Sequence, residues 1–338
     1  MLRIGIVGFG FMGRMHYANW SKCQDAKVVA ICDTDPDIVE RSKKAGGNIA
    51  GAEDAVDFDA LTVYSDYDKM LADDIVDAVS ITLPTFLHEA FSIKALEAGI
   101  HVLCEKPMAL EIEACERMID AANKSGKILQ IGHCIRFWPE YVKAKEIVDS
   151  GEYGAVVSGT FKRLGCAPNW GAGNWFTQDD RSGGVALDLH IHDSDYVQFL
   201  FGLPKGVQGF GHPASGQGMK CITTRYSYDD DKVVTAEGSW AMSPSFGFEM
   251  SFNIVMEKAT LMYDCSRDPA FKVCPVDGDA FTPDVASGDG YSLEIEHFAG
   301  CVRGEALKPV ITLKQSADSI RIVKAEIESI QNKSEIRL

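Results

Sequence analysis

The hexapeptide GFGFMG at positions 8–13 constrains the fold more than any other part of the sequence, because it has the pattern G-x-G-x-x-G. It follows the apolar run LRIGIV and opens MGRMHYANWSK, a stretch with the pattern of a helix. The first glycine of such a loop permits a tight turn, the second lets the backbone approach a ligand, and the third permits close packing of helix on strand. The segment is therefore typical of the start of a doubly wound α/β sheet.

The alternation of strands and helices continues to about residue 125. The apolar runs KVVAICD, DIVDAVSITLP and HVLCEKP are separated by stretches with helical periodicity, and KILQIGHCI follows a further helix that Gly126 ends. Strands that read as nearly continuous apolar runs belong to parallel sheets covered on both faces. We therefore predict an N-terminal domain over residues 1–125, of Rossmann type, with a boundary between 120 and 150.

From about residue 150 the pattern changes to strands with alternating polarity. AVVSGTFKRLG, MKCITTRYSYDD, KVVTAEGSWAM and GFEMSFNIVME are examples, and the chain ends in an amphipathic helix. Alternation with a period of two predicts antiparallel strands with one buried face. The second domain, residues 126–338, is accordingly predicted to be α+β with a mostly antiparallel sheet.

Composition excludes several classes of protein. The net charge of -16 disfavours nucleic acid as a partner, because such proteins gain affinity by neutralising phosphates. No run approaches the ~20 apolar residues that span a bilayer, and the N-terminus lacks the features of a secretory signal. Ten cysteines are scattered without a C-x-x-C pair, several of them in apolar strands, which favours a reducing cytoplasm over a disulfide framework.

Asp33 ends the second strand, twenty residues after Gly13. A carboxylate at this position can accept hydrogen bonds from both ribose hydroxyls of an adenosine and repels a 2′-phosphate, which favours NAD over NADP. Thr34, Asp35 and Pro36 supply no arginine for such a phosphate, although NADP stays possible. The alternative is a tight turn followed by a solvated aspartate. We expect contacts to the dinucleotide from Gly8, Phe9, Gly10, Phe11, Met12, Gly13 and Asp33.

The stretch LDLHIHDSDYV at 187–197 combines three aspartates and two histidines with apolar neighbours. It could form a metal site, a proton-transfer site or a helix with buried, paired polar groups. His190 and His192 would share a face only in a strand, whereas Asp188 and His192 have the i, i+4 spacing of helical zinc ligands. Because no third ligand is evident, we expect no metal here.

Two motifs together carry a resemblance to a known family. Glu105-Lys106-Pro107 follows the apolar run HVLC, and LDLHIHDSDYV contains the spacing D-x-x-x-H-x-x-D. With IGIVGFGFMGRMH, LPTFLHEAFSIKALEAGIHVLCEKPMAL and NWFTQDDRSGGVALDLHIHDSDYVQFLFG, these motifs make the chain similar to the Gfo/Idh/MocA (glucose-fructose oxidoreductase / inositol dehydrogenase) family, through most of its length. The resemblance implies a Rossmann domain joined to a C-terminal domain whose open sheet binds substrate and packs against a second subunit, giving a homodimer or homotetramer.

The resemblance also implies the catalytic residues. Asp188, His192 and Asp195 match the family pattern, and their i, i+4, i+7 spacing predicts one shared helix face, with His190 and Asp193 pointing elsewhere. Oxidising an alcohol removes a hydride and a proton, and histidine suits the role of base, which we assign to His192. Lys106 is expected to hydrogen-bond the reacting oxygen and Asp188 to orient the hydroxyl and the lysine. Asp195 is expected to be structural.

Further residues are expected around the crevice. The family often has Thr-Pro-Asn where this chain has Leu83-Pro84-Thr85, and a glycine where it has His190, so a bulkier edge to the site is expected. The cofactor contacts implied outside the glycine loop come from Thr82, Pro84, His88, Glu105, Lys106 and Trp175. The substrate contacts implied are from Lys106, Arg163, Asn174, Trp175, Asp188 and His192.

The sequence therefore predicts a cytoplasmic, NAD-dependent dehydrogenase that acts on a hydroxyl of a sugar, polyol or cyclitol. Its central requirement is that Lys106 and His192 act on the same hydroxyl. The alternatives are an NADP-dependent reductase or an enzyme with tightly bound NAD from the same family, and a catalytically silent NAD-sensing regulator. The substrate and the direction of the reaction stay open.

Overall fold

The computed structural model describes residues 1–42, 56–169, 172–213, 218–305, 307 and 309–338, with the backbone alone at 42 and 172–174. The chain forms two compact units. Unit 1 contains residues 1–134, 170–175 and 289–317, and unit 2 contains residues 135–169, 176–288 and 318–338. Each unit is described by itself.

Unit 1 is built on a parallel sheet with the strand order β3-β2-β1-β4-β5-β6. This is the order of a Rossmann domain, and it brings the carboxyl ends of all these strands to one edge. The strands are β1 (Leu2–Val7), β2 (Ala26–Cys32), β3 (Thr62–Tyr64), β4 (Ala78–Ile81), β5 (His101–Glu105) and β6 (Leu129–Gly132).

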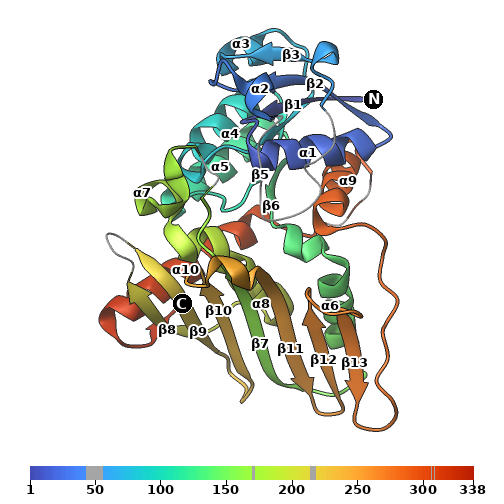
Figure 1. Ribbon diagram of the computed structural model, residues 1–338, viewed down its shortest axis with the longest axis vertical. Helices are drawn as coiled ribbons and strands as arrows, with labels where there is room; N and C mark the ends of the chain where they lie inside the picture. The colour runs from blue at the N-terminus through green and yellow to red at the C-terminus, as the bar shows by residue number, and fades with distance from the viewer. Residues whose placement is uncertain (43–55, 170–171, 214–217, 306, 308) are drawn as a thin grey trace. The chain divides into compact units, whose positions relative to one another are not determined.

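Helices cover both faces of this sheet (Figure 1). On one face Trp20 and Phe298 pack edge to face, with ring centroids 6.2 Å apart, over the buried side chains of Ile4 and Ile6. On the other face Met70 lies against the backbone of Gly5. The helices are α1 (Phe11–Lys22), α2 (Ile38–Ser42), α3 (Tyr67–Ala72), α4 (His88–Glu97), α5 (Ile112–Ser125) and α9 (Gly290–Val302).

Unit 2 is built on a sheet with the order β13-β12-β11-β7-β10-β9-β8-β14, antiparallel except where β10 pairs with β7. Along β9 the buried residues Ile222, Thr224 and Tyr226 alternate with exposed Thr223 and Arg225, as the sequence pattern predicts. The strands are β7 (Val156–Gly165), β8 (Gly206–Pro213), β9 (Met219–Ser227), β10 (Val233–Ser239), β11 (Phe248–Met256), β12 (Ala259–Asp264), β13 (Phe271–Pro275) and β14 (Ile336–Arg337).

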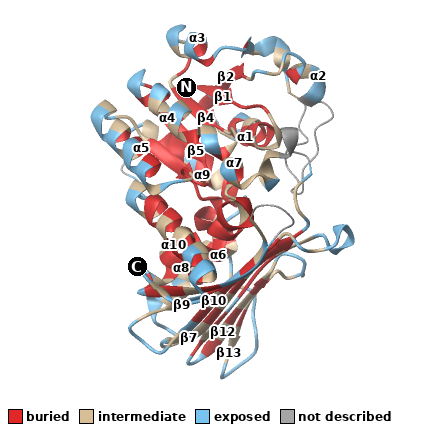
Figure 2. Cartoon of the chain, turned by 90° about the vertical axis from the view of Figure 1, so that its left-hand side faces the viewer, coloured by how far each residue is buried: buried red, intermediate tan, exposed pale blue. Residues whose placement is uncertain are grey.

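Helices α6 (Pro139–Ser150), α8 (Ile191–Phe201) and the part of α10 (Leu313–Asn332) that belongs to unit 2 pack on one face of this sheet (Figure 2). A short helix, α7 (Asp179–Ser182), precedes α8. Aromatic rings fill the space between helices and sheet: Tyr141 lies 4.7 Å from Tyr196 and 4.9 Å from Phe252, measured between ring centroids. These contacts place α8 firmly on the sheet.

The predicted fold class is confirmed, since a Rossmann-type parallel sheet is joined to a mostly antiparallel one. The structure divides the chain differently from the expected boundary at residue 125. Strand β6 completes the first sheet, and the returning helix α9 covers one of its faces, so that unit 1 includes residues from both sides of unit 2 in the sequence. Within the described ranges, no helix combines the length and the apolar character needed to cross a membrane.

Candidate functional site

The glycine loop between β1 and α1 requires glycine at two positions for steric reasons. Gly8 has φ +86°, and a Cβ atom there would lie 2.8 Å from the side chain of Leu83. A Cβ atom on Gly13 would lie 2.2 Å from the carbonyl oxygen of Gly8, closer than any real contact. At Gly10, in contrast, a Cβ atom would meet nothing within 4 Å. The fold therefore needs Gly8 and Gly13, whereas Gly10 leaves open space above the backbone for a ligand.

The N-terminus of α1 faces this open space at Gly10. The helix begins at Phe11, and its N-cap Gly10 makes no side-chain cap, so that the first backbone N–H groups are available to an anion. Phe11 and Met12 are half-buried in the first turn. Phe9, in contrast, is 1% exposed and packs edge to face on Tyr17. Among the loop residues, backbone groups rather than the Phe9 ring can contact a cofactor.

Asp33 is held in place at the carboxyl end of β2. The backbone N–H of Phe9 donates to its Oδ2 (2.8 Å), and that of Asp35 donates to its Oδ1 (2.9 Å). Arg41, from α2, lies 2.8 Å from the carboxylate of Asp35. Asp33 thus ties the glycine loop to the second strand and leaves a carboxylate beside the loop. This geometry fits the adenosine ribose of a dinucleotide.

The turns after β4 and β5 are joined by His88, the first residue of α4. Its two ring nitrogens each lie 2.8 Å from a carbonyl oxygen, one of Pro107 and one of Leu83. The side chain is 1% exposed, and burial lowers its pKa although both carbonyl groups favour the protonated ring. His88 therefore has a structural role between the two turns instead of the direct contact to the cofactor that the sequence predicts.

Thr82 fixes the glycine loop from the neighbouring strand end. Its hydroxyl group donates to the carbonyl oxygen of Gly8 (2.6 Å), and its backbone N–H donates to Val7 (2.9 Å). Pro84 is half-buried two residues later. The side chain of Thr82 thus supports the loop that would hold the cofactor.

Glu105 ends β5 and is buried beside His16 of α1, with Oε1 2.9 Å from the histidine Nε2. Its Oε2 accepts from the backbone N–H of Lys106 (3.2 Å). Burial alone would raise the pKa of Glu105, but the hydrogen bond with His16 and the charges of His16 and Lys106 outweigh it and lower the pKa. Glu105 is therefore a buried carboxylate that orients the backbone of Lys106, whose side chain is half-buried.

A second buried carboxyl group lies near Glu105. Glu294, from α9, is fully buried, and neither of its oxygens has a hydrogen-bond partner within the described part of the chain. Its Oε1 reaches over Gly132, where a Cβ atom would lie 3.4 Å from that oxygen and 3.4 Å from the Cα of Glu105. Burial, and then the charge of Glu105, raise the pKa of Glu294 well above its usual value. The fold therefore favours the protonated form of this carboxyl group more than water does.

In unit 2 the segment 185–190 is a π-helix that runs directly into α8. Single π-turns of this kind occur often at functional sites. Of the five titratable residues in the stretch 187–195, Asp188 and His192 are half-buried, whereas His190, Asp193 and Asp195 are at most 1% exposed. The stretch is thus divided into an accessible pair and a buried set.

The buried aspartates of α8 form ion pairs with buried arginines. Asp195 accepts two hydrogen bonds from Arg136 (2.7 and 2.8 Å) and a third from Ser319 of α10 (2.7 Å). Asp193 accepts from Arg163 of β7 at 3.0 and 3.2 Å. The predicted shared face of Asp188, His192 and Asp195 is therefore corrected, since Asp195 belongs to the buried side. Arg163, 3% exposed and paired, holds α8 to the sheet, in place of the substrate contact that the sequence predicts.

His190 does not form an edge of the site, because it is fully buried. Its Nε2 lies 3.3 Å from a carboxylate oxygen of Glu326 on α10. A Cβ atom on Gly238 of β10 would lie 2.8 Å from the Cβ of His190, so glycine at 238 makes room for the imidazole. The expected bulkier site edge is thus corrected: the bulk of His190 is accommodated inside unit 2.

Trp175 is half-buried within a short 3₁₀ segment that ends at Thr177, and the side chain of Asn174 lies outside the described residues. After them, the hydroxyl group of Ser182 donates to the carbonyl oxygen of Phe176 (2.6 Å) and accepts from the backbone N–H of Gly184 (2.9 Å). Ser182 therefore shapes the turn that leads into the π-helical segment.

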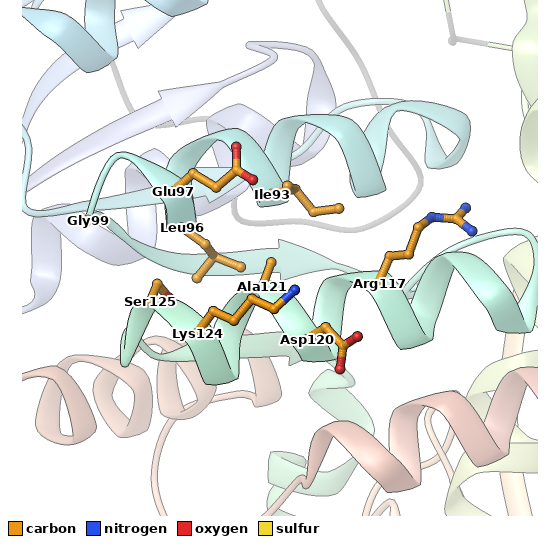
Figure 3. A pocket seen from close by; sticks show the side chains of 9 residues that line it. All are labelled: Ile93, Leu96, Glu97, Gly99, Arg117, Asp120, Ala121, Lys124 and Ser125. Carbon is orange, nitrogen blue, oxygen red and sulfur yellow. The ribbon is translucent and has the colours of Figure 1, made fainter.

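Among the described residues, no group of three or more His, Cys, Asp or Glu side chains is arranged to hold a metal ion. A hollow of about 450 Å³ lies between α4 and α5, lined by Leu96, Gly99, Arg117 and Lys124 among others (Figure 3). Gly99 directly precedes β5, so this hollow belongs to the amino ends of the strands, away from the glycine loop at their carboxyl ends.

Comparison with known proteins gives the family. A profile described as "Oxidoreductase family, NAD-binding Rossmann fold" matches residues 2–133, and the "GFO/IDH/MocA C-terminal domain" profile matches residues 141–262. The chain belongs to the Gfo/Idh/MocA oxidoreductase family. Membership accounts for both sheets, and it makes unit 1 an NAD-binding Rossmann domain, which agrees with the geometry of Gly10 and Asp33.

Named relatives of this Gfo/Idh/MocA protein differ in activity. It is 26% identical over 351 residues to the scyllo-inositol 2-dehydrogenase (NAD(+)) of Bacillus subtilis, covering 100% of this chain and 96% of that protein. It is 32% identical over 214 residues to the 2,7-anhydro-N-acetylneuraminate hydratase of Mediterraneibacter gnavus, covering 63% of this chain and 53% of that protein. The crystal structure of the WlbA dehydrogenase from Bordetella pertussis, in complex with NADH and UDP-GlcNAcA, has a TM-score of 0.84 and 22% identity, covering 100% of this chain and 97% of that one.

Several residues of the site were not foreseen from sequence. His16 and Glu294 surround Glu105 in unit 1, and Arg136 and Glu326 hold α8 in unit 2. No short motif contains these residues, because each partner comes from a distant segment. The available signal is a charged residue at an apolar position of a helix, as for Glu294 in YSLEIEHFAG.

Proposed function

We propose that this protein is an NAD-dependent dehydrogenase that oxidises a hydroxyl-bearing carbon of a sugar, polyol or cyclitol. The observation that supports it most is the division of the 187–195 stretch, where Asp188 and His192 are half-buried while His190, Asp193 and Asp195 are at most 1% exposed. The Rossmann domain of an NAD-binding family supplies the redox partner.

The cofactor would be held by unit 1. Its pyrophosphate would lie over Gly10 and the N-terminus of α1, and its adenosine ribose would bond Asp33. Bound NAD supplies the acceptor for the hydride that leaves the substrate carbon. Arg41 is already paired with Asp35, so the local charge around Asp33 disfavours a 2′-phosphate.

The protein's own groups would handle the proton. His192 takes the hydroxyl proton, so that hydride loss yields a neutral carbonyl. Lys106 donates a hydrogen bond to the reacting oxygen and stabilises its developing negative charge. Asp188 accepts from a substrate hydroxyl and orients it. Glu105, held by His16, fixes the backbone from which the Lys106 side chain extends.

The first test is turnover. Purified protein with NAD and a panel of inositols, aldoses and glycosides should give NADH absorbance with at least one substrate. His192→Ala should lower kcat by about 10²–10⁴-fold while NAD affinity changes little, because a general base contributes about that much. Loss of NAD binding in this variant would contradict the assignment. Lys106→Met, combined with His192→Ala, should cost less than the sum of the single effects if both groups serve one hydroxyl.

The second test separates cofactor binding from folding. Gly10→Ala adds a methyl group where the protein has open space, so the variant should keep its thermal stability and yet lose NAD affinity. Gly126→Ala, at a left-handed helix end away from the loop, is the control for a glycine replacement. Unchanged NAD binding by Gly10→Ala would place the pyrophosphate elsewhere.

A second candidate follows from the relative named a hydratase, since net hydration is not a redox reaction. A protein of that kind would retain NAD and return the hydride within one turnover. Substrate loss without net NADH, together with NAD that stays with the protein on gel filtration, would favour it over the dehydrogenase.

We further propose a homo-oligomer formed through the sheet face of unit 2 that α6, α8 and α10 leave open. This face presents exposed Thr223, Arg225, Val233 and Asn253. Light scattering measures the mass in solution. A charged substitution at Val233 should lower that mass if the face is an interface.

A further inference from the structure

Glu326 is fully buried on α10, and its carboxylate contacts two residues of one turn. Its Oε1 accepts from the hydroxyl group of Ser194 (3.0 Å), and its Oε2 lies 3.3 Å from Nε2 of His190. The hydroxyl groups of Ser194 and Tyr226 are 3.0 Å apart. We call Glu326, His190, Ser194 and Tyr226 the Glu326 cluster. It joins α10, the end of the π-helical segment, α8 and β9.

A buried carboxylate costs several kcal/mol of desolvation unless its partners compensate for it, so such a group is seldom a neutral choice in a protein core. Here Oε1 has a donor in the hydroxyl group of Ser194, while Oε2 has the 3.3 Å contact with His190 and no hydrogen bond among the described residues. Gly238 leaves room for the imidazole of His190, and the other charged groups near the cluster, Asp193 and Arg163, are already paired with each other. The carboxylate of Glu326 thus contacts both ends of the short segment 190–194.

That segment is the one that carries the proposed base. His190 and Ser194 lie two residues before and two residues after His192 in the chain, and both contact the same carboxylate. Asp188 lies two residues before His190, inside the π-helical segment. Restraining residues 190 and 194 therefore restrains the backbone position from which the imidazole of His192 extends.

We propose that Glu326 is a positioning residue for His192: by holding His190 and Ser194 from α10, it fixes the turn that presents His192 and Asp188 to the substrate. This inference rests on the proposed role of His192 as the base. Small displacements of a catalytic group lower the rate of the chemical step much more than they lower affinity. The cluster therefore acts on kcat and leaves cofactor binding unaffected.

The test compares Glu326→Gln with Glu328→Gln, an exposed glutamate two residues away on the same helix. Glu326→Gln keeps the size of the side chain and removes its charge. It should lower kcat by about 10–100-fold, while KM and the Kd for NAD stay within about threefold. Glu328→Gln should leave all three unchanged. An unchanged kcat in a folded Glu326→Gln protein overturns the proposal.

A double-mutant cycle shows whether the effect passes through His192. In the His192→Ala background Glu326→Gln should have almost no further effect on kcat, because the group it positions is gone. An equal loss in both backgrounds would assign Glu326 to general stability instead. If Glu326→Gln fails to fold, Ser194→Ala removes one of the two contacts and should show the same dependence on His192, with a smaller loss of kcat.

The failure of the proposed function gives a different result. If His192→Ala retains the wild-type kcat, the base is wrongly assigned, and the positioning role fails with it. If His192→Ala is inactive while both Glu326→Gln and Ser194→Ala retain the wild-type kcat, the base stands and the positioning role alone is rejected.

Discussion

The two units bury carboxyl groups in opposite ways. In unit 2, Asp193 and Asp195 are each at most 1% exposed, and each accepts hydrogen bonds from a buried arginine. In unit 1, Glu294 is buried to the same degree, yet its two oxygens have no hydrogen-bond partner among the described residues. Similar burial thus comes with different surroundings: the aspartates of α8 lie against arginines, whereas burial raises the pKa of Glu294 well above its usual value.

The difference shows that burial by itself does not tell whether a carboxyl group stabilises a fold. A buried ion pair depends on both of its members, because removing one leaves the other charge uncompensated. A buried acid without a hydrogen-bond partner lowers the free energy of unfolding, and replacing it can raise that free energy. The predictions below use this contrast, starting with the largest expected effect.

Asp195→Ala should lower the free energy of unfolding of unit 2 by about 3–5 kcal/mol, because it leaves the guanidinium group of Arg136 buried without its counter-charge. Urea denaturation followed by circular dichroism measures this loss. The exposed Asp149, paired with Lys145, provides the control variant Asp149→Ala. If both variants lose the same small amount, the buried pair contributes no more than a surface one, and the contrast between the units is wrong.

Glu294→Gln should raise the free energy of unfolding by about 1–3 kcal/mol at pH 8, because an amide needs no proton to stay neutral in the core. The pKa of Glu294 is raised in the folded chain above its usual value of 4.5. Between these two values the folded state holds one more proton than the unfolded state, so wild-type stability falls as pH rises. The difference between variant and wild type should therefore grow from pH 5 to pH 8.

Thermal unfolding measured across that pH range checks this sign. Glu105 is the charge that acts on Glu294, and it is unchanged in the variant. Glu296→Gln, an exposed position on the same helix, is the matched control and should show no such trend. A difference that is constant with pH would mean that the pKa of Glu294 is not raised in the folded protein.

Ser319→Ala should lower the free energy of unfolding by about 1 kcal/mol. It removes the hydroxyl group that donates to Asp195 and accepts from Gln198, while the ion pair with Arg136 stays in place. A loss as large as that of Asp195→Ala would show that the hydroxyl group, and not the arginine, is the main partner. Chemical denaturation of the two variants side by side gives the comparison.

Lys145→Ala should change the free energy of unfolding by no more than about 0.5 kcal/mol, since its ion pair with Asp149 at the surface of α6 is solvated. Its small effect should also diminish in high salt. Among the variants compared here, Lys145→Ala is expected to show the smallest loss in the free energy of unfolding. A salt-independent loss above about 0.5 kcal/mol would point to the contact of Lys145 Nζ with the Phe199 ring, 4.9 Å from the ring centroid, instead of the ion pair with Asp149.

Local patterns carried most of what could be predicted. The glycine loop, Asp33 and the alternation of strands and helices depend on neighbours in sequence, where sterics and periodicity act directly. The hydrogen bonds and ion pairs between buried polar residues could not be predicted from local patterns, because the partners are far apart in the chain. His16 and Glu105 are separated by 89 residues, Arg136 and Asp195 by 59, and Ser194 and Glu326 by 132. One sequence contains no information on such pairings until the fold is known.

The π-helical segment was missed for a different reason. The sequence pattern of an α-helix tolerates one extra residue per turn, and the apolar residues of the segment are buried in either geometry. The predicted face containing Asp188, His192 and Asp195 assumed a regular helix. The structure kept the first two accessible and turned the third inward.

The π-turn has a consequence for anyone who edits or aligns this region. Because each α-helical residue advances the helix by about 100°, deleting a single amino acid within 185–190 would rewind the turn into ordinary geometry, keep the flanking helix nearly in register and redirect the side chains inside the segment. Asp188 would then point in a new direction although the residue itself was unchanged. In comparisons between homologues, a one-residue gap at this place can outweigh many substitutions.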